Sequence, residues 1–308
     1  MQLSLVTMAT MAPPPNFFGW LNVALALALA AASAWAFRRL RGTTLSAPAA
    51  WAAIAALTIA AVESLLALRP EMEAHLSASL LRYAAAVGTF CPMMAVLGAK
   101  RPQDRGWQWV VAALWITLLV PAGQALASSA ASRLDLFPAW RLMIVALIAM
   151  GLLNYLPTRN ALPALLTAAA QACLFAAYLL ETPPGNPQVR VTLGLTALLL
   201  AALIAHAQSL SLRGLPRSPR TTSEDALSHL THRWLVFRNA WGAFWALRIM
   251  HRTNQAAEAA HWPVRLQWHG FTTVEGCPDG DGGGLVAGHL EQTLDSLLRR
   301  FEGRQSDE

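Results

Sequence analysis

Seven apolar stretches, each close to the length that crosses a lipid bilayer, fill most of the first two thirds of this chain. A helix rises 1.5 Å per residue, so about 20 mostly apolar residues span ~30 Å of hydrocarbon. The sequence is 55% hydrophobic and 13% charged, whereas soluble domains carry ~25% charged residues. It therefore predicts an all-α integral membrane helical bundle of seven transmembrane helices. The predicted spans are 17–37, 51–68, 76–99, 107–127, 138–156, 161–180 and 189–208.

Basic residues in the connections predict the orientation, because Lys and Arg resist translocation across the membrane. Ten follow odd-numbered spans: Arg38, Arg39, Arg41, Lys100, Arg101, Arg105, Arg159, Arg213, Arg217 and Arg220. Three lie in the alternate connections: Arg69, Arg133 and Arg190. The amino terminus is therefore predicted outside, and the carboxyl-terminal region in the cytoplasm, of a bacterial inner (plasma) membrane.

The chain divides into four predicted parts. These are an extracytoplasmic N-terminal tail over 1–16, the transmembrane domain over 17–208, a basic proline-containing linker over 209–222 and a cytoplasmic amphipathic α(+β) region over 223–308. In the last part, a helical pattern over 224–260 is broken near Asn239 or Gly242. The alternation at 264–269 predicts a short strand, whose partner is either the segment near 271–274 or another chain. A final helix is predicted over 285–301.

Ionisable residues inside the predicted spans are few, and two of them lie at the same depth. Glu63 precedes the outer end of the second span, and Arg82 follows the outer start of the third. Both fall roughly 8 to 10 Å below the boundary, so we expect them to pair. The pair is either a structural pin between two helices or part of a proton or ion pathway. Arg141 competes for Glu63, or it extends to the lipid headgroups.

The third span contains Cys91, Pro92 and Met93. Cysteine and methionine sulfurs are soft ligands that suit Cu(I), whereas a proline kink with ordinary packing explains the same residues. His229 and His232 stand three apart, yet no further ligand completes a metal site. No nucleophile motif accompanies a histidine and an acid. The sequence therefore predicts no catalytic, metal or cofactor site.

The connection 98–107 is compact and basic, and it ends at Trp107. It is predicted to anchor the topology at the membrane interface, or to bind an anionic lipid or a phosphate. Together with the run Phe90-Cys91-Pro92, this stretch resembles uncharacterised multi-pass membrane proteins of bacteria. The resemblance covers about a quarter of the chain and implies no activity.

Aromatic and arginine side chains share one side of the helix predicted over 224–260. Rings beside guanidinium groups suit the membrane interface; the alternative is a helix packed on the rest of the tail, with the arginine stems over the rings. Nucleic-acid binding is disfavoured, because the chain from residue 209 onward carries 11 arginines and 11 acidic residues. The predicted face consists of Trp234, Arg238, Trp241, Trp245, Arg248 and Arg252.

These patterns favour a non-enzymatic membrane protein whose cytoplasmic tail docks a partner or the inner leaflet, in assembly, anchoring or signalling. The alternative is a transporter of a small solute or metal ion that uses the intramembrane acid Glu63. The expected partners are the lipid bilayer, anionic lipid headgroups at the basic cytoplasmic loops, and a cytoplasmic or membrane protein.

Overall fold

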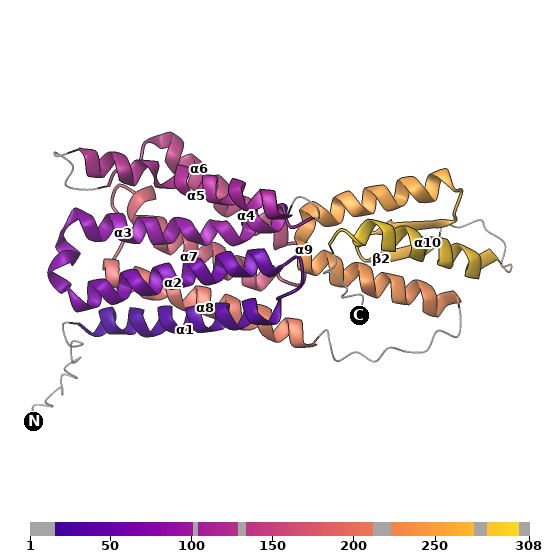
Figure 1. Ribbon diagram of the computed structural model, residues 1–308, viewed down its shortest axis with the longest axis horizontal. Helices are drawn as coiled ribbons and strands as arrows, with labels where there is room; N and C mark the ends of the chain where they lie inside the picture. The colour runs from indigo at the N-terminus through magenta and orange to yellow at the C-terminus, as the bar shows by residue number, and fades with distance from the viewer. Residues whose placement is uncertain (1–15, 101–103, 129–133, 212–222, 274–281, 302–308) are drawn as a thin grey trace, which may run out of the picture.

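The computed structural model describes residues 16–100, 104–128, 134–211, 223–273 and 282–301. Seven helical segments are long and apolar enough to cross a membrane, which confirms the predicted number. They form one elongated bundle (Figure 1). The predicted 1–16 tail, except Asn16, and most of the 209–222 linker lie outside the described residues. Six of these segments coincide with, or lie within, single helices: α1 Phe17–Arg39, α2 Ser46–Leu68, α5 Asp104–Ala127, α6 Pro138–Tyr155, α7 Ala161–Leu179 and α8 Pro187–Ser211.

The third apolar segment is interrupted where the sequence carries Pro92. It consists of α3 Leu76–Val87, the 3-10 turn η2 Gly88–Phe90 and α4 Cys91–Leu97. Proline suits the first turn of a helix, because its missing N–H would have no intrahelical partner there. A Cβ on Gly88 would lie 3.5 Å from the Ala55 Cβ of α2. The small residues at the interruption thus let α2 approach closely.

Aromatic side chains fill the centre of the bundle between α3, η2 and α7. Phe90 stacks on Phe175 with ring centroids 5.3 Å apart, and Tyr83 meets Tyr178 edge-on at 5.1 Å. The Tyr83 hydroxyl donates a hydrogen bond to the Leu118 carbonyl oxygen of α5 at 2.9 Å. The helices α3, α5 and α7 are therefore joined through one aromatic core.

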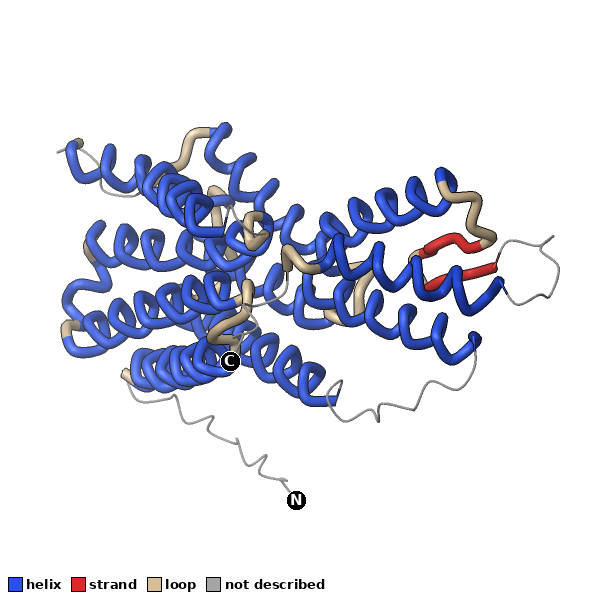
Figure 2. Tube along the Cα trace, turned by 45° about the vertical axis from the view of Figure 1, so that its right-hand side comes forward, coloured by secondary structure: helices blue, strands red, loops and turns tan. Residues whose placement is uncertain are grey.

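The tail, residues 223–273 and 282–301, extends from one end of the bundle (Figures 1 and 2). We call this the tail end and the opposite end the distal end. The helix α9 Ser223–Ala259 turns at Gly242, where φ is 77° and ψ is −177°. Glycine adopts this conformation without strain, and the break predicted near Asn239 or Gly242 is therefore at Gly242. Both limbs of α9 run from this turn away from the bundle (Figure 1).

A hairpin and a final helix complete the tail. Strand β1 Val264–Gln267 pairs antiparallel with β2 Gly270–Thr273, so the predicted strand finds its partner in the same chain. The helix α10 Gly282–Leu298 packs on α9. The tail core takes residues from all these elements and from the end of the bundle; among them are Val96, Leu230, Trp234, Phe237, Trp241, Trp245, Leu266, Leu290, Leu294 and Phe301.

Candidate functional site

Two carboxylates hold one guanidinium near the distal end of the bundle. Arg82 Nε lies 2.9 Å from Glu63 Oε1, and Nη2 lies 3.0 Å from Oε2. The same guanidinium binds Glu73 of the 3-10 helix η1 Pro70–Ala74, with contacts of 2.8 and 2.6 Å. The Glu63 side chain is only 4% exposed. Glu63 and Arg82 thus form the pair that their depth predicted, and Arg141 instead pairs with Asp135 at 2.6 Å.

Uncharged side chains extend this network to two further helices. Gln188 of α8 donates from Nε2 to Glu73 Oε1 at 2.7 Å. Asn22 of α1 donates from Nδ2 to Gln188 Oε1 at 3.0 Å and accepts from Thr192 Oγ1 at 2.6 Å. Asn22 is fully buried, so these bonds satisfy an amide that would otherwise be costly to bury. The network fixes α1, α2, α3 and α8 against one another.

The network borders a cavity of about 450 Å³, which we call the distal cavity. Its lining includes both signs of charge, from Glu63, Glu73, Arg82 and Arg190. Tyr178 also lines it and donates its hydroxyl hydrogen to the Ser79 carbonyl oxygen at 2.7 Å. A cavity with this lining suits a small polar or charged solute.

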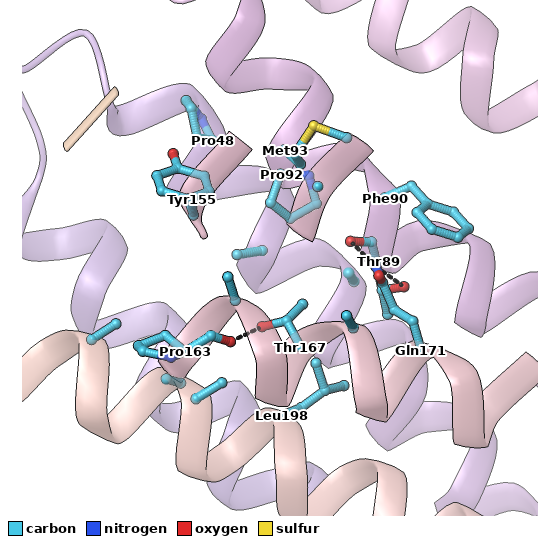
Figure 3. A pocket seen from close by; sticks show the side chains of 18 of the residues that line it. Pro48, Thr89, Phe90, Pro92, Met93, Tyr155, Pro163, Thr167, Gln171 and Leu198 are labelled. Carbon is cyan, nitrogen blue, oxygen red and sulfur yellow. Dashed lines mark hydrogen bonds between the residues drawn. The ribbon is translucent and has the colours of Figure 1, made fainter. Parts of the chain in front are cut away.

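A second cavity of about 420 Å³, the tail-side cavity, lies further along the bundle. Its wall is mainly apolar and includes Pro92 and Met93 (Figure 3). Gln171 Nε2 donates to Thr89 Oγ1 at 3.2 Å, and Thr167 Oγ1 donates to a backbone carbonyl of its own helix at 2.8 Å. Because these polar groups are bonded to protein, the cavity offers an occupant mostly apolar surface.

The two cavities follow one another along the bundle and share one wall residue. Ile59 of α2 lines both of them and is 5% exposed. On α7 the tail-side cavity is lined by residues 163–171 and the distal cavity by residues 173–178. Ile59 lies four residues, about one helical turn, from Glu63. An isoleucine side chain therefore lies between a charged cavity and an apolar one.

The structure places Cys91 and Met93 in different surroundings. Cys91 is 1% exposed in a packed cluster with Ala95 and Val111, whereas Met93 lines the tail-side cavity. In the part of the chain that the structure describes, no group of three His, Cys, Asp or Glu side chains could hold a metal ion. The arrangement therefore gives Pro92 and Met93 a role in shaping the cavity wall.

Side chains from the end of the bundle hold the turn of α9. Asn154 Oδ1 of α6 accepts a hydrogen bond from the Phe244 backbone N–H at 3.0 Å. Asn160 Nδ2 donates to the Asn239 carbonyl oxygen at 2.7 Å. A Cβ on Gly242 would lie 2.4 Å from Asn154 Nδ2, so glycine is required here by contact as well as by conformation. The turn is thereby fixed to α6 and to the connection after it.

The same turn forms part of the tail-side cavity. Ala240 lines this cavity together with Tyr155 and Asn160. The Tyr155 hydroxyl donates to the Ala240 carbonyl oxygen at 3.3 Å. One residue of the cavity lining is therefore supplied by the tail, a contact that no sequence pattern indicated.

The predicted aromatic and arginine face is divided by the structure. Trp234, Trp241 and Trp245 are at most 6% exposed, so they are part of the tail core and do not form an exposed interfacial face. Arg238 lies with Cζ 5.1 Å from the Trp268 ring centroid, and burial lowers the pKa of its guanidinium. Arg248 and Arg252, by contrast, are exposed. The three tryptophan rings and Arg238 are thus packed within the tail, as in the second of the two predicted alternatives. Of the predicted face, only Arg248 and Arg252 are exposed.

Comparison of the chain with known protein families, with curated proteins and with solved structures found no match. The observed features are a bundle with seven membrane-compatible helices, a polar and an apolar cavity, and a tail residue that lines the apolar one. These features carry the functional argument.

Proposed function

We propose that this is a non-enzymatic multi-pass protein of the inner membrane, in which the occupant of the tail-side cavity and the position of the cytoplasmic tail depend on each other. Its role would be signalling, with the tail docking a partner protein or the inner leaflet. The observation that carries this proposal is Ala240, which belongs to the tail helix and also lines the cavity.

Coupling of this kind requires an occupant that interacts differently with two arrangements of the protein. An occupant of the tail-side cavity touches Ala240 only when the turn of α9 is seated against Tyr155 and Asn160. It therefore stabilises the seated tail. Displacing the tail opens that wall and weakens binding by the same factor.

The wall of the cavity limits the chemistry of the occupant. Cavities of 300–1,000 Å³ with few polar groups bind small, mostly apolar molecules, and this one measures about 420 Å³. Its polar groups at Thr89, Thr167 and Gln171 already have protein partners. The expected occupant is therefore an acyl chain or an apolar molecule of similar size.

The membrane orientation belongs to the same proposal. Ten basic residues follow odd-numbered spans and three lie in the alternate connections, which supports an outer distal end and a cytoplasmic tail. Under this orientation the distal cavity lies near the outside, and the tail-side cavity lies next to the cytoplasmic domain.

The experiment fills the cavity and follows both the occupant and the tail. Ala168→Phe from α7 and Ala52→Leu from α2 place larger side chains in the tail-side cavity. Leu142→Phe adds a ring at a position of α6 that is 70% exposed and serves as the control. Native mass spectrometry in mild detergent records retained molecules, and hydrogen exchange records the turn near Gly242.

We expect the wild type and Leu142→Phe to retain an apolar molecule that both filled variants lose. Filling should also change hydrogen exchange near Gly242, while exchange in α10 stays the same. The proposal is wrong if the filled variants fold and retain the same molecules as the wild type, or if the turn does not respond in either of them.

The two adjoining cavities favour a second candidate function, a transporter of a small solute or metal ion. Ile59 is the shared wall between the cavities, and Glu63 lies one helical turn away. Proteoliposomes that contain a pH-sensitive dye test for proton-coupled flux. If Glu63 is a transport acid, the Glu63→Gln variant should fold but show no flux. If Glu63 is a structural pin, the variant should be less stable, and even the wild type should show no flux.

A further inference from the structure

Four cations gather where the tail meets the end of the bundle: Lys100, Arg248, Arg252 and Arg300, here called the basic cluster. Lys100 Nζ lies 5.6 Å, and Arg248 Cζ 5.7 Å, from the centroid of the same ring, that of Trp245. Arg252 follows Arg248 by one helical turn on α9. Arg300 precedes Phe301, whose ring centroid is 5.1 Å from that of Trp245. The cluster thus draws on the bundle connection and on two parts of the tail.

The basic cluster has no anionic partner among the residues that the structure describes. In the same tail the half-buried Arg233 pairs with Asp295 at 2.5 Å; none of the four clustered cations has such a contact with a described carboxylate. Burial, followed by the charges of Arg300, Arg248 and Arg252, lowers the pKa of Lys100. Like charges are therefore brought together without a described counter-charge, which favours an anion from outside the chain.

Large apolar side chains are exposed beside the cluster. Phe244 is 55% exposed and Leu247 is 51% exposed; they lie on the limb of α9 that carries Arg248 and Arg252. The Phe244 N–H is bonded to Asn154 near the end of α6. Exposed apolar residues next to arginines are typical of a surface that contacts the headgroup region of a membrane.

The level of this surface along the molecule identifies the source of the anion. Trp245 Nε1 donates to the Val96 carbonyl oxygen at 3.3 Å, and Val96 lies at the end of the third apolar segment. Phe244 and Trp245 therefore lie where two candidate spans end, the level at which bilayer hydrocarbon would meet the headgroups. The cations begin at this level and continue one to two helical turns beyond it.

We infer that the basic cluster, with Phe244 and Leu247, is a binding site for an anionic phospholipid of the leaflet that faces the tail. The phosphate is bound by the exposed guanidinium groups of Arg248 and Arg252, and the two apolar side chains contact the adjoining glycerol and acyl region. The inference rests on the membrane insertion that the proposed function contains. It adds a lipid whose binding holds the second limb of α9 against the membrane.

The test titrates phosphatidylglycerol into the full-length protein in neutral detergent and measures bound lipid by native mass spectrometry. Arg248→Gln/Arg252→Gln removes two cations of the site. The control Arg265→Gln/Arg299→Gln removes two exposed arginines that are not members of the basic cluster. Each basic residue beside an anionic leaflet changes binding by a factor of about 5. We therefore expect the first variant to bind roughly 30-fold more weakly, and the control to change by less than about 2-fold.

A second variant and two competing ligands make the test selective. Phe244→Ser/Leu247→Ser changes exposed positions and should weaken phosphatidylglycerol binding while the tail stays folded. Phosphatidylcholine should bind much more weakly than phosphatidylglycerol, and inorganic phosphate should not displace the lipid at equal concentration. Displacement of the lipid by phosphate would mean that the site binds a free anion. An equal loss of lipid binding in the Arg265→Gln/Arg299→Gln control would mean that binding depends only on the total charge of the tail. Either result overturns the inference.

Failure of the underlying proposal is visible separately. Alkaline extraction of membranes leaves integral proteins in the pellet, so release of the full-length chain would refute membrane insertion itself. A chain that stays in the pellet but shows no preference for phosphatidylglycerol would refute only the lipid site.

Discussion

Replacing Arg82 by leucine should destabilise the bundle by about 3–5 kcal/mol, the usual cost of removing one partner of a buried ion pair. The reason is the burial of the acid that remains. The Glu63 side chain is 4% exposed, and in the structure both of its oxygens bind Arg82. Leucine would leave that largely buried carboxylate without its guanidinium partner. Glu73 would suffer less, because it is 27% exposed and keeps the hydrogen bond from Gln188.

Removing both members of the pair should restore most of the lost stability. Apolar residues in place of a buried ion pair are often neutral or stabilising, so Glu63→Leu/Arg82→Leu should be more stable than Arg82→Leu alone. Glu73→Gln is the milder control. Arg82 keeps its two bonds to Glu63 in that variant, and a partly exposed ion pair contributes at most about 1 kcal/mol.

The free energy of unfolding can be measured in mixed micelles of neutral detergent and dodecyl sulfate, with helix content followed by circular dichroism. The expected order of stability is wild type, Glu73→Gln, the double variant and then Arg82→Leu. The reasoning is refuted if the double variant is as unstable as Arg82→Leu. It is also refuted if Arg82→Leu costs less than about 1 kcal/mol, a value typical of exposed pairs.

Two further substitutions test the junction of tail and bundle. Gly242→Ala should speed hydrogen exchange in the turn of α9, because alanine is strained at φ 77° and its Cβ would meet Asn154; Gly123→Ala, with no atom within 4 Å of the added Cβ, should not. Lys100→Met should stabilise the protein in neutral detergent by up to about 1 kcal/mol, since the pKa of Lys100 is lowered on folding. The free energy of unfolding rises with pH where the unfolded chain binds more protons than the folded one. The stability of the wild type should therefore approach that of the variant as pH increases toward 10.5. A constant difference between the two proteins would contradict the charge argument.

The apolar segments and the pairing of two charges could be predicted from the sequence, because both predictions follow from helical rise and the length of an apolar span. The predicted seven spans match seven helices, and Glu63 does meet Arg82. The second acid, Glu73, was missed because it lies in a short polar connection, where a carboxylate is ordinarily solvated. Its position on the 3-10 helix η1, which brings it back over Arg82, depends on the tertiary fold.

The tail shows the limit of a periodicity argument. The spacing of Trp234, Trp241 and Trp245 identifies one side of a helix, but it does not identify what covers that side. In the structure α10 and the end of the bundle cover it, because the turn at Gly242 rests against α6. The contribution of Ala240 to the tail-side cavity had no sequence signal, since an alanine in a helix satisfies every pattern equally.

Lys100 is the single lysine of the chain, and its ammonium group lies against Trp245 at the junction of bundle and tail. An amine-reactive fluorophore would therefore modify this position and, at most, the amino terminus of the chain. Indole rings quench many dyes on contact, so the brightness of such a label would report separation of the tail from the bundle. The natural sequence thus carries its own attachment point for a single-molecule recording of tail movement.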